Sequence, residues 1–460
     1  MGFFRDLKPS EQLLTEPLLH YSLRFYAFVA LLGSIVALGA YAYFTQLQQG
    51  LAVTAMRDNV LWGLYITNFV FFIGISHVGA LMSAILRLSG AEWRHPITRM
   101  AEAITFCSLV FGALMPIVDL GRPDRILNLL LYGRIQSPIL WDMISITTYL
   151  IGSSIFLLLP LIPDIAMLRD RLRGISRVRM WLYRKLSLGW KGSPDQRARL
   201  DKAINTMTIL ILPIAISVHT VVSWIFGMTL RTGWNSTIFG PYFVAGALFS
   251  GVASVMVAMA LFRHFYHLES FITLQHFKNM AKILLVLDLG YIYFTISEYL
   301  TVAYKWETSE GQLLESLFTG TYAIPFLFVQ LGGLITPALL LAYGLRKGRH
   351  PVLAYAVAGT LVTVTMWVKR FVIVVPSLAV PQMGASWGSY SPTWVEWSIT
   401  AAAFAGFILL YTVFSRLFPI VSIWETEEAA HNKARHGPTD TSPEKEGPAD
   451  FWNKSREARP

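Results

Sequence analysis

The chain has 460 residues, of which 54% are hydrophobic and only 14% are charged, and its mean hydropathy is +0.50. A soluble domain carries roughly 25% charged residues, so this composition excludes a soluble enzyme, a disordered scaffold and a secreted disulfide-rich protein. The formal net charge of +10 does not indicate nucleic-acid binding, because the basic residues lie mainly in loops between long apolar segments. The sequence therefore predicts an all-α polytopic membrane protein whose solvent is the lipid bilayer.

Ten apolar segments are long enough to cross a hydrocarbon core about 30 Å thick. If the N-terminus is cytoplasmic, the loops on that side hold 19 Lys and Arg residues and the opposite loops hold 6. Cytoplasmic loops carry the excess of basic residues in membrane proteins, so both termini are predicted to be cytoplasmic. We expect the spans near residues 25–46, 60–86, 100–118, 139–162, 204–230, 240–262, 281–304, 322–345, 351–376 and 396–417.

These spans divide the chain into six parts. The last part is rich in Glu and Pro and cannot bury a core, so it is predicted to be disordered. Cys107 is the only cysteine, which excludes an internal disulfide and an Fe–S cluster held by this chain alone. The predicted parts are a cytoplasmic or interfacial N-terminus (1–24), a first helix with its connection (25–59), a first bundle (60–230) with a basic cytoplasmic loop (163–203), a second bundle (231–376), a last helix (377–423) and a disordered tail (424–460).

A short repeat suggests how the helices are grouped. Arg99-Met100-Ala101-Glu102 opens the third span, and Asn279-Met280-Ala281-Lys282 opens the seventh. Each follows a span rich in Gly, Ala and Ser, residues that let helix backbones approach closely in lipid. We therefore expect two four-helix bundles, made by spans two to five and six to nine, with spans one and ten flanking them.

Polar residues gather at one membrane boundary. Asp119 ends the third span and is followed by Arg122, while Asp142 lies in the first turns of the fourth span. Ionisable residues within a membrane are rare and are often functional, and a carboxylate at such a boundary can act as a proton acceptor. The alternative is a structural cluster of ion pairs and helix caps that closes the loop.

Two histidines lie within spans. His219 could hydrogen-bond a quinone oxygen and accept a proton near neutral pH, or it could be a core histidine bonded to a neighbouring helix. His77 lies among small residues and could equally be a packing residue. Their expected depths in the membrane differ by about 9 Å, which argues against a haem held between them. No metal site is predicted.

Two acidic residues lie in the cytoplasmic half of their spans. Glu102 and Asp288, together with His77, form a candidate proton path, although a buried hydrogen bond between helices would explain Asp288 as well. Lys369 and Arg370 lie in the outer half of the ninth span. We expect them to extend to the outer surface, as long basic side chains near a helix end do.

The motifs resemble the NrfD/PsrC family, the quinone-interacting membrane subunits of bacterial respiratory complexes. The resemblance covers residues 55 to 290 well and the remainder loosely. It rests on Asp119-Leu120-Gly121-Arg122-Pro123, Ser137-Pro138-Ile139-Leu140-Trp141-Asp142, Gly74-Ile75-Ser76-His77-Val78-Gly79, Ser217-Val218-His219-Thr220 and Pro241-Tyr242-Phe243-Val244.

Ten spans and a long basic central loop are most similar to the two related membrane subunits of bacterial alternative complex III. This resemblance implies a bacterial inner-membrane protein that binds menaquinol or ubiquinol near the outer face and holds no haem or Fe–S cluster itself. The implied partners are c-type cytochrome subunits, an extracytoplasmic Fe–S subunit and a paralogous membrane subunit. The quinol-oxidising copy is expected to have His before Leu-Gly-Arg-Pro, where this chain has Asp119, so both the copy and its paralogue stay open.

The leading hypothesis is a quinol-oxidising subunit with Asp119, Asp142 and His219 as catalytic residues. Arg122 and Trp224 complete the predicted quinone-binding set. One alternative is a scaffold or proton-conducting subunit without a quinone site of its own. A secondary transporter is a further alternative, but transporters place their substrate near the midplane between repeats, whereas this polar cluster lies near one face.

Overall fold

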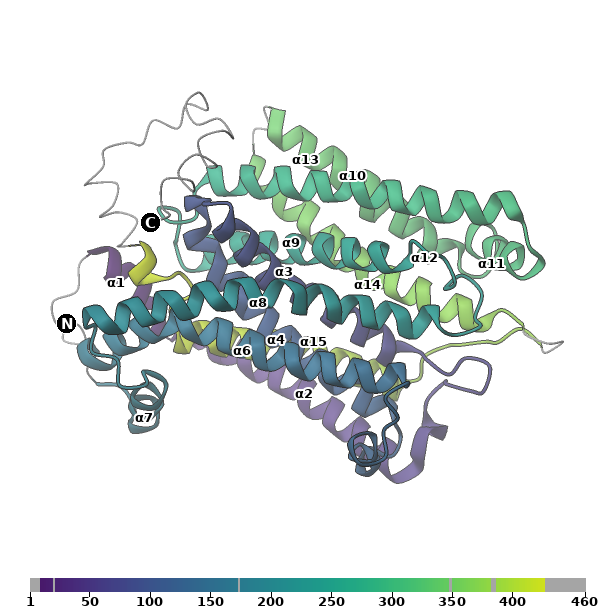
Figure 1. Ribbon diagram of the computed structural model, residues 1–460, viewed down its shortest axis with the longest axis horizontal. Helices are drawn as coiled ribbons and strands as arrows, with labels where there is room; N and C mark the ends of the chain where they lie inside the picture. The colour runs from purple at the N-terminus through teal and green to yellow at the C-terminus, as the bar shows by residue number, and fades with distance from the viewer. Residues whose placement is uncertain (1–8, 20, 173, 347–349, 382–385, 427–460) are drawn as a thin grey trace, which may run out of the picture.

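The computed structural model describes residues 9–19, 21–172, 174–346, 350–381 and 386–426, and within these ranges the chain is helical with no β-strand (Figure 1). Ten described segments are long and apolar enough to cross a membrane, which confirms all ten predicted spans. They are α2 (Leu23–Gln49), α3 (Leu64–Leu88), α4 (His95–Asp119), α6 (Pro138–Arg171), α8 (Pro194–Gly227), α9 (Phe239–Phe265), α10 (Leu274–Lys305), the run α12 (Ala323–Leu327), π-helix (Phe328–Ile335) and α13 (Thr336–Arg346), then α14 (Pro351–Ala379) and α15 (Trp394–Leu417).

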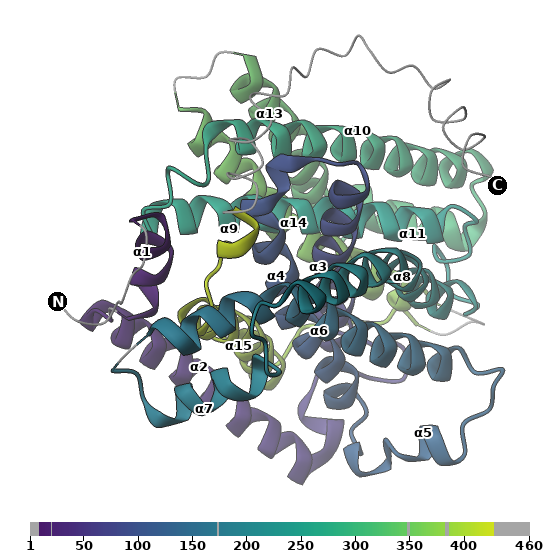
Figure 2. The same ribbon diagram turned by 60° about the vertical axis from the view of Figure 1, so that its left-hand side comes forward.

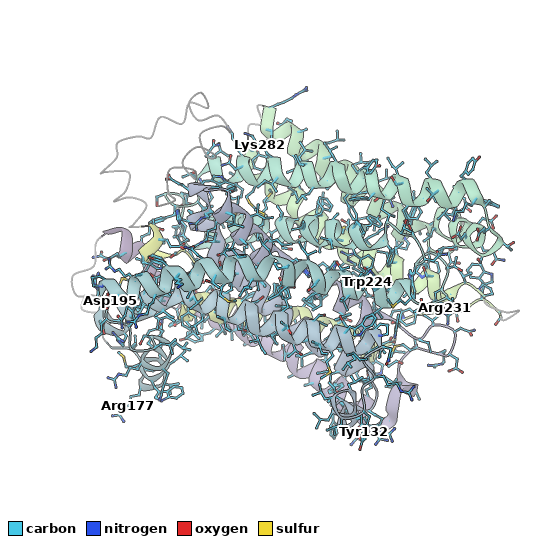
Figure 3. All side chains as sticks on the ribbon, in the orientation of Figure 1. Tyr132, Arg177, Asp195, Trp224, Arg231 and Lys282 are labelled. Carbon is cyan, nitrogen blue, oxygen red and sulfur yellow. The ribbon has the colours of Figure 1, made fainter. Side chains whose placement is uncertain are left out.

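The short helices lie at the two ends of the molecule. They are α1 (Pro9–Thr15), α5 (Asn128–Leu131), α7 (Arg177–Leu186) and α11 (Thr308–Phe318). In Figure 1, α1, α7 and residues 418–426 lie at one end, which we call the basic end, and α11 lies at the opposite end. Helix α5, labelled in Figure 2, ends beside Tyr132, which Figure 3 also places toward the opposite end. Figure 3 labels Arg177 and Asp195 at the basic end and Tyr132 and Arg231 at the opposite end.

Two helices extend much further than predicted. α6 and α8 each have 34 residues, which at 1.5 Å per residue makes each about 50 Å long and longer than the bilayer core. α8 begins early because the Ser193 hydroxyl accepts a hydrogen bond from the Gln196 amide and Pro194 occupies the first turn. The predicted loop 163–203 is therefore too long, since α6 continues to Arg171, α8 begins at Pro194 and α7 lies between them.

The contacts between helices fall into two groups of four. The first group consists of α3, α4, α6 and α8, and the second consists of α9, α10, α14 and the segment that ends with α13. The division of these helices into two separate four-helix bundles stays a prediction. α3 and α9 join the groups, and Gly251 lets them approach, because a Cβ atom there would lie 2.7 Å from that of Val78. α3 is consequently the central helix, because 94% of its most apolar 18-residue stretch is buried inside the protein.

The first and last spans pack against each other. A Cβ atom on Gly39 of α2 would lie 2.1 Å from the Cβ atom of Ala402 on α15, so the two backbones are in close contact. The pair lies beside α4 and α3, and both views show the two helices side by side (Figures 1 and 2). Spans one and ten thus lie together beside the first group, whereas the sequence predicted only that they flank the bundles.

Residues 418–426, which we call the closing segment, pack onto the basic end of the first group. Ile420, Val421 and Ile423 are buried, and Glu425 is only 5% exposed. The prediction of disorder from residue 424 is wrong for residues 424–426, because a polar composition did not reveal the basic side chains that bind Glu425. Residues 427–460 lie outside the described part of the chain.

Candidate functional site

The centre of the first group holds a cluster of three rings. The imidazole centroids of His77 and His219 lie 4.7 Å apart, and the Tyr149 ring lies 5.3 Å from His77. Both histidines are completely buried. The predicted offset of 9 Å is therefore wrong, because α3 runs from Leu64 to Leu88 and the midpoint of the predicted span 60–86 lies three residues too early.

The two imidazoles have different surroundings. His77 Nδ1 lies 2.6 Å from the Ile73 carbonyl oxygen and Nε2 lies 2.7 Å from that of Ala215. A neutral imidazole donates from only one nitrogen, so both contacts are hydrogen bonds only when the ring is protonated. With both nitrogens facing carbonyl oxygens, His77 is unsuited to ligate haem iron. By contrast, neither nitrogen of His219 makes a well-directed hydrogen bond among the described residues, although the Phe243 backbone lies near the ring.

Asp142 is the buried carboxylate of α6 near the opposite end, and like the Ser83 and Ser153 hydroxyls it has a polar atom without a well-directed hydrogen bond among the described residues. Its side chain is 8% exposed, and no described residue hydrogen-bonds its Oδ1 atom. Asp142 and Tyr149 lie on the same buried face of α6, seven residues apart, which places Asp142 about 10 Å nearer the opposite end than the ring cluster. Buried polar atoms are nearly always hydrogen-bonded, so Asp142 and His219 are the natural partners for a polar ligand.

Asp119 has a different environment, on the side where α4 meets α2 and α15. The neighbouring Val118 carbonyl accepts a hydrogen bond of 2.8 Å from Gln46, whose Oε1 in turn accepts one of 2.6 Å from Tyr65. Asp119 interacts electrostatically with Glu396. No hydrogen bond or ion pair within the described ranges joins Asp119 to Asp142 or His219. Nor does any bond among the described residues join Asp142 to His219, so the three predicted catalytic residues share one helix group without a hydrogen bond between them.

Arg122 lies in the exposed loop after α4. It donates two hydrogen bonds to Asp124, of 3.0 and 2.9 Å, and 63% of its side chain is exposed. These bonds lower the pKa of Asp124 below its ordinary value and raise that of Arg122. The predicted quinone-binding role is therefore not supported by geometry, because Arg122 orients a solvent-exposed carboxylate instead of Asp119 or Asp142.

Trp224 lines a groove on the lipid-facing side of α8 and α9. The groove has a volume of about 740 Å³ and is mainly apolar, with Asn235, Ser236 and Thr237 at its polar end. Ser223 also lines it, and His219 lies one helical turn away on the neighbouring face of α8. Figure 3 shows Trp224 toward the opposite end of the molecule. Such a groove suits an amphipathic molecule that arrives from the bilayer.

The three residues of the predicted proton path lie apart. His77 belongs to the ring cluster, and Glu102 lines a small cavity at the basic end. Asp288 lies in the second group on α10, completely buried, and neither oxygen has a hydrogen-bond partner in the described structure. The structure therefore does not join all three into one path.

Comparison with known proteins identifies the family. The sequence profile described as "Polysulphide reductase, NrfD" matches residues 52–382. The chain belongs to the NrfD family.

Its NrfD-family relatives include membrane subunits of several redox complexes, and the chain covers most of each. A protein of Halobacterium salinarum, described as a candidate membrane subunit of dimethyl sulfoxide reductase, is 27% identical over 84% of this chain and 89% of its own length. A subunit of the selenate reductase of Mesobacillus selenatarsenatis is 24% identical over 88% and 97%. The integral membrane subunit of menaquinone reductase of Nitratidesulfovibrio vulgaris is 24% identical over 83% and 88%. These names do not extend to alternative complex III, and that part of the resemblance stays a prediction.

This NrfD-family chain also buries two basic side chains that were predicted to reach the surface. Lys369 and Arg370 are each 1% exposed, so that prediction is wrong. Lys369 donates a hydrogen bond of 2.9 Å to the Tyr299 hydroxyl. The Arg370 guanidinium lies 5.1 Å from the centre of the Phe243 ring, and Phe243 lies beside His219. The structure therefore places a buried cation between the two helix groups.

Sequence reasoning missed two further features of this family member. The first is Tyr149, which donates a hydrogen bond to the Ser76 carbonyl and contacts the His77 ring. It was missed because a tyrosine in an apolar span has no distinctive sequence pattern. Arg99 and Asp164 form a buried ion pair with an N–O distance of 2.5 Å. Asp164 falls within the predicted loop. The sequence did offer one signal that Asp164 belongs to a helix: the helical pattern continues unbroken from the span through Asp164 to Arg171, seven residues later.

Proposed function

We propose that this chain is the quinol-oxidising membrane subunit of an electron-transfer complex. The substrate would be menaquinol or ubiquinol, and the electrons of the quinol would pass to an extracytoplasmic Fe–S partner and on to c-type haems. The observation that carries this proposal is the pair Asp142 and His219, two buried side chains in one helix group. The Asp142 Oδ1 atom and both His219 nitrogens make no well-directed hydrogen bond among the described residues. Family membership supports it, because one relative is named as a membrane subunit of menaquinone reductase.

The chemistry follows from these two side chains. Oxidation of one quinol releases two electrons and two protons. The Asp142 carboxylate and the His219 imidazole are each able to accept one proton, and a buried general base contributes typically 10²- to 10⁴-fold to a rate. Asp142 lies nearer the opposite end, so its proton would leave on that side. Neither residue carries electrons, so the electron acceptor must dock close to the quinol.

The groove beside Trp224 supplies a route from the lipid. A quinol has a long apolar tail and a polar ring, and the groove has apolar walls with a polar end. The tail would lie along α8 and α9 while the ring approaches His219. Asp119 and Arg122 have less support as quinone-binding residues, since one faces α2 and α15 and the other is exposed.

The proposal also fixes an orientation and partners. The basic end would face the cytoplasm of a bacterial cell, with both termini there, because it carries the excess of Lys and Arg. The opposite end would then face outward, where the Fe–S protein and c-type cytochrome subunits bind. A paralogous membrane subunit would complete the assembly, as in alternative complex III.

The test is quinol oxidation by the purified native complex carrying Asp142→Asn. This change keeps the size of the side chain and removes the proton acceptor, so turnover should fall at least 100-fold while assembly and redox centres stay intact. Asp124→Asn is the matched control, because Asp124 is an exposed carboxylate on the same side and should leave turnover within twofold. Unchanged turnover in Asp142→Asn would assign the chemistry to another subunit.

The second candidate function is a scaffold or proton-conducting subunit without its own quinone site. It is favoured by Asp119, which stands where His is expected in the quinol-oxidising copy, and by the buried Asp288. In that case photoaffinity labelling with an azidoquinone would modify a different subunit. A secondary transporter has less support, although the π-helix Phe328–Ile335 does interrupt one span.

A further inference from the structure

The basic end of the first group contains a small polar cavity. It has a volume of about 10 Å³, which is close to the minimum that holds one water molecule. Its lining is unusually rich in ionisable groups for the inside of a membrane protein. The polar lining consists of Ser83, Arg87, Arg94, Thr98, Arg99, Glu102, Ser422 and Glu425.

A water molecule in this cavity would have the polar partners that it needs. The Ser83 side chain is 3% exposed, and its hydroxyl oxygen lies beside the Glu102 carboxyl group without a well-directed hydrogen bond in the described structure. Glu102 is 6% exposed. A buried water needs two to four polar partners, and these two side chains together with the basic residues supply them.

The closing segment covers the cavity and is held by charge. Glu425 Oε1 accepts a hydrogen bond of 2.8 Å from Arg87, and Arg94 and His95 lie 3.9 and 3.5 Å from the same carboxylate. Asp164 accepts the backbone amides of Ile423 and Trp424 at 3.1 and 3.0 Å. Ser422 and Glu425 thus close the cavity from the basic end.

A polar route leads from the cavity to the ring cluster. Thr105 lies one turn beyond Glu102 on α4, about 4.5 Å along the helix axis. Its hydroxyl donates a hydrogen bond of 2.5 Å to the Ser76 carbonyl, and Tyr149 donates one of 2.9 Å to the same oxygen. Ser76 directly precedes His77, whose two carbonyl contacts are both satisfied only by the protonated ring.

We propose that the cavity at Glu102 is a water and proton site, and that residues 418–426 are its removable lid. When Glu425 leaves its basic partners, a hydronium ion from the solvent at the basic end gives one proton to the Glu102 carboxylate and remains as water. This inference rests on the proposed function only for the use of the proton at the quinol site. The charged and titratable groups facing the cavity are Arg87 on α3, Arg94 and His95 before and at the start of α4, Arg99 and Glu102 on α4, Asp164 on α6 and Glu425 on the lid.

The lid is tested by cysteine labelling of the full chain in lipid nanodiscs. Because Cys107 is the only cysteine and is fully buried, a Cys107→Ala background gives no other reactive thiol. In it, Ser83→Cys should be protected from a membrane-impermeant maleimide, and adding Glu425→Ala should raise the labelling rate at least tenfold. Thr98→Cys is a second probe of the same cavity. Asp170→Ala is the control, because it removes an exposed carboxylate at the same end.

The proton site is tested in proteoliposomes with an internal pH dye and valinomycin. Glu425→Ala should increase passive proton flux, and Glu102→Gln added to it should restore the original flux. Equal labelling with and without Glu425 would overturn the lid, and a flux increase that persists in the double variant would overturn the role of Glu102. Neither assay uses quinol. A negative result in the labelling or flux assay therefore does not affect the proposed quinol oxidation, and a negative result for quinol oxidation does not affect these two assays.

Discussion

The ion pair between Arg99 and Asp164 should be one of the most sensitive points of the fold. Both side chains are at most 2% exposed, and their closest N–O distance is 2.5 Å. Arg99 also donates to the Pro160 carbonyl at 2.9 Å and to Ser422 at 3.1 Å. Removing one partner of such a pair leaves an uncompensated buried charge, which typically costs about 3–5 kcal/mol. Since proteins are stable by only about 5–15 kcal/mol, Asp164→Asn should lose a large share of the free energy of unfolding.

A double-mutant cycle isolates the interaction. Arg99→Met and Asp164→Asn should each destabilise by about 3–5 kcal/mol, whereas the double variant, which buries no unpaired charge, should lose clearly less than their sum. Unfolding by SDS in mixed micelles, followed by circular dichroism, gives the three differences. Asp170→Asn is the matched control, because Asp170 is 61% exposed in its pair with Arg169 and should change stability by less than about 1 kcal/mol. Effects that add within about 0.5 kcal/mol would refute the claim that the two charges depend on each other.

Three further predictions use close contacts and charge. Gly246→Ala should destabilise the protein by about 1–3 kcal/mol, because the new Cβ atom would lie 2.9 Å from Tyr291 and 3.1 Å from Arg370. Gly74→Ala is the control in the same SDS titration, and it should have little effect because the nearest atom to its Cβ would be 3.6 Å away. Gly39→Val should separate α2 from α15 and speed proteolysis of the N-terminal span, and Gly33→Ala, with no atom within 4 Å, should not. Burial alone would raise the pKa of Glu425, but His95, Arg87 and Arg94 outweigh it and hold that pKa below its ordinary value. The lid should therefore stay docked when the pH is above the ordinary pKa of a glutamate, roughly 4.3. It should be released as the pH falls through the lower pKa that Glu425 has in the folded protein. A spin label on Thr426→Cys should report this release, and Glu425→Gln should abolish the pH dependence.

The ten spans could be predicted because hydropathy is a local property. A helix in lipid must satisfy its own backbone hydrogen bonds, so each apolar segment can be identified without reference to the rest of the chain. The boundaries were harder, because helices continue into water wherever a cap such as Ser193 permits it. A boundary error at α3 also made the predicted depth of His77 wrong, as the contact between His77 and His219 demonstrates.

The candidate site could be predicted only in part, because it depends on contacts between distant residues. Asp142 and His219 were visible as polar residues in apolar spans, and their burial agrees with the expectation that they face the interior. The burial of Arg370 could not be predicted, since it depends on which helices lie alongside α14. A basic residue near a helix end extends to water when it faces lipid, but Arg370 faces Phe243 and the neighbouring helix group.

The pairing of α2 with α15 has a consequence for how the chain is made. Gly39 and its contact Ala402 are about 360 residues apart, and at a synthesis rate of about 5–20 residues per second the second helix emerges about 20–70 seconds after the first. During that interval α2 has inserted but lacks its final neighbour, and its small-residue face is turned toward lipid. The first helix to enter the membrane is thus among the last to reach its native contacts, and a ribosome that stops before residue 394 leaves it permanently unpaired.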